Sequence, residues 1–288
     1  MIYLALSILF STSLLVIFKF FEKHGINNTV GIIVNYITAA STGFIMSGKA
    51  PDISLIAGSE WSPFAMLIGT IFVSLFFTIA ISAQKNGMAI TSVANKMSLV
   101  IPTIAAVFLY QESLQFLTIV GIVLALTGVV FTALKSDQNN HLNRSAFLFP
   151  AIIFLGSGIS DTLLKYVQFY YLHNVTVEYF SAVLFATAGS AGIIIFIFMQ
   201  FKKRQKIRIK DILGGIALGI PNYFSIHYLF LALDQKGINS STLIPINNIG
   251  IVVASALVGL LFFSEKYSML NKIGLLLSVL AIVLIALV

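Results

Sequence analysis

The sequence predicts an all-α integral membrane protein with ten transmembrane helices. Apolar residues make up 58% of the chain and charged residues only 9%, whereas about 25% of residues are charged in ordinary soluble domains. Apolar runs of about 20 residues, the length that spans a bilayer as a helix, recur along the chain. The two halves also repeat each other, which in membrane proteins is typical of transporters.

The apolar runs and the polar breaks between them define the expected spans. Breaks such as Gly48–Asp52 and Lys85–Gly87 combine glycine or proline with polar residues. The first run begins at Met1 with no basic segment and no small-residue cleavage site, so we expect a retained span and not a signal peptide. The expected spans are 2–21, 28–47, 63–83, 90–110, 115–134, 146–170, 176–201, 212–233, 238–263 and 269–288.

The internal repeat is clearest between Tyr110–Leu134 and Phe263–Leu287. A shift of 153 residues places Glu112 on Glu265 and Gly121 on Gly274, with seven identities in 25 positions. The repeat predicts a first unit at 1–134, a connecting loop at 135–145 and a second unit at 146–288. Because five spans is an odd number, the two units must lie in opposite orientations in the membrane.

These residues resemble the EamA-like branch of the drug/metabolite transporter superfamily. In that family each half ends in a glutamate, a short link and a helix with two glycines, matched here by Glu112, Gly121 and Gly128, then Glu265 and Gly274. Ala281 replaces the last glycine. The family's prolines match Pro102 and Pro245. The resemblance implies ten helices, no enzymatic activity, and export of a small polar or amphipathic metabolite, an amino acid or a derivative first, across the inner membrane.

The composition excludes several other classes of function. The chain has no cysteine, so disulfides and thiolate metal sites are excluded, and its four histidines lack metal-ligand spacing. We therefore expect no metal and no cofactor. No phosphate-binding loop is present, so ATP coupling would need another chain. The net charge of +7 resides in short loops and does not indicate nucleic acid. The partners expected are a small molecule and the lipid bilayer, with the chain as monomer or homodimer.

The membrane orientation stays open at this stage. Thirteen lysines and arginines fall in odd-numbered loops and two in even-numbered loops. The positive-inside rule then puts the odd loops in the cytoplasm and both termini outside. The family resemblance implies the reverse.

Lys96 leads the predicted substrate-binding residues. A charged side chain inside a span is costly, which makes each one a functional candidate. Lys96 lies about six residues inside span four beside Asn95, and the equivalent part of span nine carries Asn247 and Asn248. We expect these side chains to face one another across a pocket in which the lysine holds a carboxylate or phosphate. The alternative is that Lys96 extends its ammonium to the membrane interface.

Other intramembrane polar residues complete the predicted sites. Asp161 and Lys165, four residues apart on span six, are candidates for proton coupling or a structural ion pair, and His227 is a second proton candidate. Asn222, near the middle of span eight beside a proline, and Asn35, with neighbouring Tyr36 in span two, are candidate pocket residues.

Glu112 and Glu265 suggest architecture more than chemistry. Each stands at a span boundary, where a carboxylate can accept hydrogen bonds from the first turn of the following helix or pair with a loop cation. The alternative functions are a membrane-embedded enzyme and a passive channel or scaffold. Asp161 is the single clearly buried acid, which disfavours an enzyme with paired carboxylates.

Overall fold

The computed structural model of the protein describes residues 2–111, 115–134, 144–172, 175–202, 206–233 and 240–287. These residues form helices and links, with no strand in the described ranges. Ten helical segments are long and apolar enough to cross a membrane. The chain is therefore a multi-pass membrane protein, as the composition predicts, and nine of the ten segments are unbroken helices.

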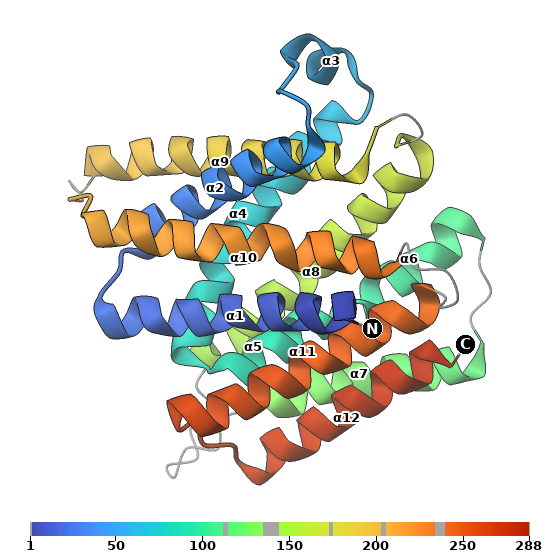
Figure 1. Ribbon diagram of the computed structural model, residues 1–288. Helices are drawn as coiled ribbons and strands as arrows, with labels where there is room; N and C mark the ends of the chain where they lie inside the picture. Colours follow the sequence, from blue (N-terminus) through green and yellow to red (C-terminus); the bar gives the residue numbers. More distant parts are fainter. Residues whose placement is uncertain are drawn as a thin grey trace.

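The helix bounds agree with the expected spans to within a few residues. In chain order they are α1 (Ile2–His24), α2 (Asn28–Ser47), α3 (Ile53–Gly58), α4 (Ser62–Lys85), α5 (Met88–Met97), α6 (Val100–Tyr110), α7 (Phe116–Ala133), α8 (Arg144–Tyr170), α9 (Val177–Lys202), α10 (Ile209–Leu233), α11 (Ser240–Phe263) and α12 (Met269–Ala286). The short helix α3, capped by Asp52, was not predicted and projects from the bundle beyond α2 (Figure 1).

Span four is broken, which the sequence analysis did not predict. Helix α5 ends at Met97, and α6 begins at Val100. Pro102 has no N–H and cannot bond the carbonyl of Ser98 four residues earlier. Instead, the Ile101 N–H donates to the Ser98 carbonyl at 2.9 Å, which tightens the turn at the break. Free helix ends inside a membrane are tolerated where they border protein or a cavity.

Helices from the two halves of the sequence pack mainly against each other. Helix α7 packs on α12, α2 on α9 and α5 on α11, while α1 contacts α10 and α11, and α8 contacts α4, α5 and α6. Glycines allow the closest approach between α7 and α12. A Cβ atom on Gly274 would lie 2.6 Å from the Thr132 nitrogen, and one on Gly121 would lie 2.6 Å from Ile285. Both motif glycines therefore serve helix packing.

The bundle has two distinct ends. Both chain termini lie at one end, together with the α3 segment (Figure 1). The links from α1 to α2, α9 to α10 and α11 to α12 lie at the other, which we call the cationic end after Lys23, Lys85, Lys206, Lys210 and Lys266. There the Lys210 ammonium donates to the carbonyl of His24 at 2.7 Å, which joins the two halves.

Candidate functional site

A cavity of about 180 Å³ lies between helices of both halves. Polar side chains from α1, α5, α10 and α11 line it beside apolar ones from α1, α4, α10 and α11. The polar lining residues are Ser7, Ser11, Thr91, Ser92, Asn95, Lys96, Ser225 and Asn247. The apolar ones are Leu14, Leu15, Phe18, Phe76, Ile79, Ile226, Leu229 and Ile251. Lys96 is the only charged residue among the lining residues that the structure describes.

Helical spacing explains why α5 presents its polar residues to the cavity. Ser92, Asn95 and Lys96 stand three and four residues apart, which places them on one face of a helix. Lys96 also lies in the last turn of α5. Unpaired carbonyls at a helix C-terminus carry partial negative charge and favour a cation by up to about 2 kcal/mol in a partly buried site. The break at Ser98 therefore helps α5 to hold a lysine inside the bundle.

Lys96 and Asp161 lie on two helices that pack together, α5 and α8. The Ser98 hydroxyl, two residues after Lys96, donates to the Asn95 carbonyl at 2.5 Å. One turn earlier, the Asn95 amide donates to the Ser157 hydroxyl at 3.0 Å. The sequence paired Asp161 with Lys165 on the same helix. The Asn95–Ser157 bond brings Lys96, from the other half of the sequence, near Asp161 as a second cation that no local spacing could identify.

Asp161 is exposed on the surface of α8 although it lies within a membrane span. The stripe Ser157, Asp161, Lys165 and Gln168 changes from buried at Ser157 to exposed at the other three residues. Ile159 lies on the exposed apolar face of α8. Asp161 is two residues further along, about 200° around a 3.6-residue helix, and so lies on the other side of α8. The stripe therefore forms a polar track that leads from the α5 contact towards the end of the bundle where the termini lie.

Asn247 brings an unsatisfied acceptor to the cavity. Its side chain is 2% exposed, and its Oδ1 atom has no hydrogen-bond partner. An unpaired buried polar atom costs about 1–3 kcal/mol, so it calls for a donor from a ligand or water. Asn248, also predicted for this site, is buried but is not among the residues that line the cavity.

Asn35, Asn222 and Tyr36 lie outside the cavity lining. The Asn222 amide donates to the Asn35 Oδ1 at 3.2 Å in a buried pair between α2 and α10. Tyr36 is fully buried in the core, and its hydroxyl donates to the Phe72 carbonyl at 2.9 Å. The Asn222 carbonyl accepts a bond from Ser225, which does line the cavity. These contacts indicate a supporting role for the three residues.

His227 does not line the cavity, although its chain neighbour Ile226 does. Its ring stacks on Tyr223, with the centroids 5.6 Å apart, and lies near Phe224 and Tyr228. No contact in the described part of the chain links it to Lys96 or Asp161. The proton-coupling prediction for His227 therefore has no structural support beyond its place on span eight.

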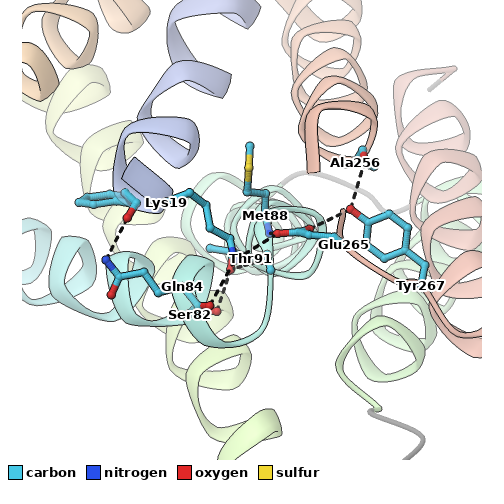
Figure 2. A network of polar contacts seen from close by, with 10 residues as sticks. Lys19, Ser82, Gln84, Met88, Thr91, Ala256, Glu265 and Tyr267 are labelled. Carbon is cyan, nitrogen blue, oxygen red and sulfur yellow. Dashed lines mark hydrogen bonds and ion pairs between the residues drawn. The ribbon is translucent and has the colours of Figure 1, made fainter. Parts of the chain in front are cut away.

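Glu265 joins three elements at the cationic end of the cavity (Figure 2). Its carboxylate accepts the Met88 N–H at 2.9 Å and the Tyr267 hydroxyl at 2.9 Å, and pairs with the Lys19 ammonium at 3.4 Å. We call these four residues the Glu265 cluster. Burial, and then the nearby carboxylate, raise the pKa of Tyr267, so its phenol stays protonated and donates.

The Glu265 cluster caps α5 from the other half of the protein. Gly87, the residue before α5, supplies no side-chain cap, and its φ of 103° lies in a region open to glycine. Sequence analysis expected a capping or ion-pair role and assigned it to the following helix. The actual helix lies 177 residues away in sequence. Glu112, the repeat partner of Glu265, lies outside the described residues.

The cluster stands directly below the cavity. Lys19 follows the lining residue Phe18, and Thr91, which lines the cavity, bonds both the Gly87 carbonyl and Ser82 at 2.8 Å. The Lys19 ammonium also donates to the Gln84 carbonyl at 3.2 Å. The cavity therefore borders, towards the cationic end, on groups that have hydrogen-bond partners.

Comparisons with known proteins show a family and a fold. An uncharacterized protein of Haemophilus influenzae is 30% identical over 286 residues, which cover 97% of this chain and 95% of that protein. The chain therefore belongs to one family with the Haemophilus influenzae protein. A crystal structure of another protein has a TM-score of 0.59 at 16% identity, covering 98% of this chain and 97% of that one, and so shares the fold. No protein-family model matches the chain.

Proposed function

We propose that this protein is a secondary transporter that carries a small, polar or amphipathic metabolite across the cell's inner membrane by alternating access. The observation that carries the proposal is the cavity between the two halves, with a charged and several polar side chains among apolar ones. Binding sites of transporters characteristically lie at the interface of two repeats, beside broken helices. Lys96 stands in the last turn before such a break.

The packing pattern supports an inverted repeat. Helix α1 is the first span of the first half and α8 the first span of the second, while α4 and α10 are the third span of each half. If each span is exchanged for its counterpart, the contact of α1 with α10 becomes the contact of α8 with α4, and both contacts are present. Likewise the contact of α1 with α11 becomes that of α8 with α5. Such exchange relates the halves as the sequence repeat requires and lets one half move against the other around a central site.

In the proposed mechanism the Glu265 cluster closes the cationic end of the cavity. The Glu265 cluster ties α1, α5 and the link between α11 and α12 below the cavity. On the other side, the polar track of α8 is exposed. Opening towards the cationic end requires Glu265 to separate from Met88 and Lys19. The positive-inside rule favours a cytoplasmic cationic end, so this state faces away from the cytoplasm.

Proteoliposomes test the transport proposal directly. Vesicles loaded with candidate metabolites should show saturable counterflow with purified protein, and none with empty vesicles. Chemical conversion of a metabolite without counterflow would instead support a membrane-embedded enzyme. Non-saturable flux would support a channel. Either result would contradict the proposal.

Cysteine labelling tests alternating access and orientation together. The natural chain contains no cysteine, so Ser11→Cys places a single thiol in the cavity lining. A membrane-impermeant maleimide should label it from the side of the chain termini. In the Ser11→Cys/Glu265→Ala protein, labelling from the cationic side should rise. Equal labelling of both proteins from both sides would show that the cluster does not close the cavity.

A further inference from the structure

The charges around the cavity point to the substrate class and to the ion that travels with it. Transporter substrates must find partners for each of their polar groups, because buried groups left unpaired weaken binding. The cavity offers one cation, one orphaned acceptor, several hydroxyls and an apolar wall. These features can be matched, one by one, to the parts of a ligand.

Lys96 matches an anionic group. It is the one charged side chain among the described lining residues, and no carboxylate joins it on the cavity wall. A zwitterion would bring an ammonium group with no acidic partner at the wall. A ligand with a net negative charge fits this charge balance better.

Asn247 matches a hydrogen-bond donor on the same ligand. Its unpaired Oδ1 atom requires an O–H or N–H group. A hydroxyl group supplies this donor without a second charge. Leu15, Phe76 and Ile251 are among the apolar residues that remain for a hydrocarbon part. The volume of about 180 Å³ compares with the cavity of about 150 Å³ that takes benzene, so about eight non-hydrogen atoms fit.

Asp161 determines when Lys96 is available. The Asn95 amide of α5 bonds the Ser157 hydroxyl of α8 at 3.0 Å, which brings Lys96, the next residue, to the part of α8 that carries Asp161 one turn further on. An ionised Asp161 therefore competes with a ligand carboxylate for Lys96. Helices α4, α5, α6 and α7 pack against α8. Of the charged residues on these four helices, Lys96 on α5 is the one near Asp161. On α4, Lys85 lies over Phe149, near the opposite end of α8. The other titratable residues on these helices are Arg144, Lys165, Tyr166 and Tyr170 on α8 itself and Tyr110 at the far end of α6; α7 has none.

We propose that the cavity binds a small hydroxy monocarboxylate through Lys96 and Asn247, and that Asp161 takes up one proton when the anion binds. The inference rests on the proposed transport function. The proton converts the Asp161 carboxylate to a carboxylic acid, Lys96 keeps its ammonium, and the ligand carboxylate replaces Asp161 as its partner. One anion and one proton then move together, with no net charge carried.

Calorimetric titration of the full chain in detergent tests the ligand class with four probes of one carbon skeleton. Hydroxyisovalerate carries both groups, isovalerate lacks the hydroxyl, hydroxyisovaleramide lacks the charge, and valine replaces the hydroxyl by an ammonium. Hydroxyisovalerate should bind at least about 10-fold tighter than the amide and about 5-fold tighter than isovalerate. Tighter binding of valine, or equal binding of acid and amide, would overturn the proposal.

Matched variants assign the contacts. Lys96→Met should weaken hydroxyisovalerate at least about 10-fold, while Lys272→Met, which removes an exposed lysine at the start of α12, should leave it unchanged. Asn247→Leu should erase the difference between hydroxyisovalerate and isovalerate. Survival of that difference in a folded Asn247→Leu protein would remove Asn247 from the site.

The pH dependence tests the proton. Between about pH 8 and pH 5 the probe stays mostly ionised, so its affinity should rise as the pH falls, because binding takes up a proton. The amide probe should show no such rise. Asp161→Asn should bind hydroxyisovalerate tightly at both pH values. A pH-independent affinity in the wild type would overturn the coupling. Binding without counterflow in proteoliposomes would refute transport but keep the site, whereas counterflow of valine alone would refute the site but keep transport.

Discussion

The cavity and the Glu265 cluster are both polar regions between the halves of the protein, and they differ in hydrogen-bond saturation. In the cluster, the Glu265 carboxylate has an N–H, an O–H and an ammonium partner within 3.4 Å. In the cavity, the Asn247 oxygen has none. Polar groups that satisfy each other hold a structure together, whereas unsatisfied ones raise its energy until a ligand or water arrives. The difference supports a structural joint in the cluster and the proposed binding site in the cavity.

The largest expected effect is on stability, from Glu265→Ala. The substitution leaves the Lys19 ammonium, 14% exposed, without its carboxylate, and leaves α5 without its cap. Breaking a buried ion pair costs about 3–5 kcal/mol. The melting temperature in detergent should fall strongly. Glu22→Ala removes an exposed carboxylate from the same end of the bundle and serves as the control. Equal melting temperatures for the two variants would contradict a structural joint.

Gly87→Ala should have a smaller effect on the same joint. The backbone at Gly87, with φ 103° and ψ 162°, lies in a region used almost only by glycine, and an added Cβ would stand 2.8 Å from a Glu265 oxygen. We expect a loss of about 2–3 kcal/mol. Gly48→Ala is the matched control, because Gly48 has φ 66° and no atom within 4 Å of the added Cβ. If Gly48→Ala lowers the melting temperature as much, contact with Glu265 is not the cause.

Variants of Asn35 and Asn222 test whether this buried pair only stabilises the protein or also belongs to the proposed binding site. Asn35→Leu or Asn222→Leu alone leaves the partner amide unpaired in a buried site, at about 1–2 kcal/mol each. The double variant should cost less than the sum, because both polar groups leave together. Melting temperatures measure this coupling. Hydroxyisovalerate affinity should not change. If either single variant weakens binding as much as Lys96→Met, the pair belongs to the binding site.

The sequence predicted the spans well because span length and apolarity are local properties. It also located Lys96 and Asn247, because charged and amide side chains inside apolar runs stand out in any reading. It did not predict the break between α5 and α6, although Pro102, four residues after Ser98, is a signal for it. It could not find the approach of Lys96 to Asp161 or the Glu265–Met88 contact. Those residues lie 65 and 177 positions apart in sequence, and only the packing of α8 on α5 and of the α11–α12 link on α5 brings them together.

Ser92→Ala should have the smallest effect and tests whether saturation matters within the cavity itself. Ser92 lines the cavity, but its hydroxyl already bonds Ser255 of α11 at 2.5 Å and the Ala89 carbonyl at 3.0 Å. A satisfied hydroxyl has little to offer a ligand, so hydroxyisovalerate affinity should fall less than about 3-fold, while stability falls by about 1 kcal/mol. A loss of affinity as large as that of Asn247→Leu, at unchanged melting temperature, would show that hydrogen-bond saturation does not separate joint from binding site in this protein.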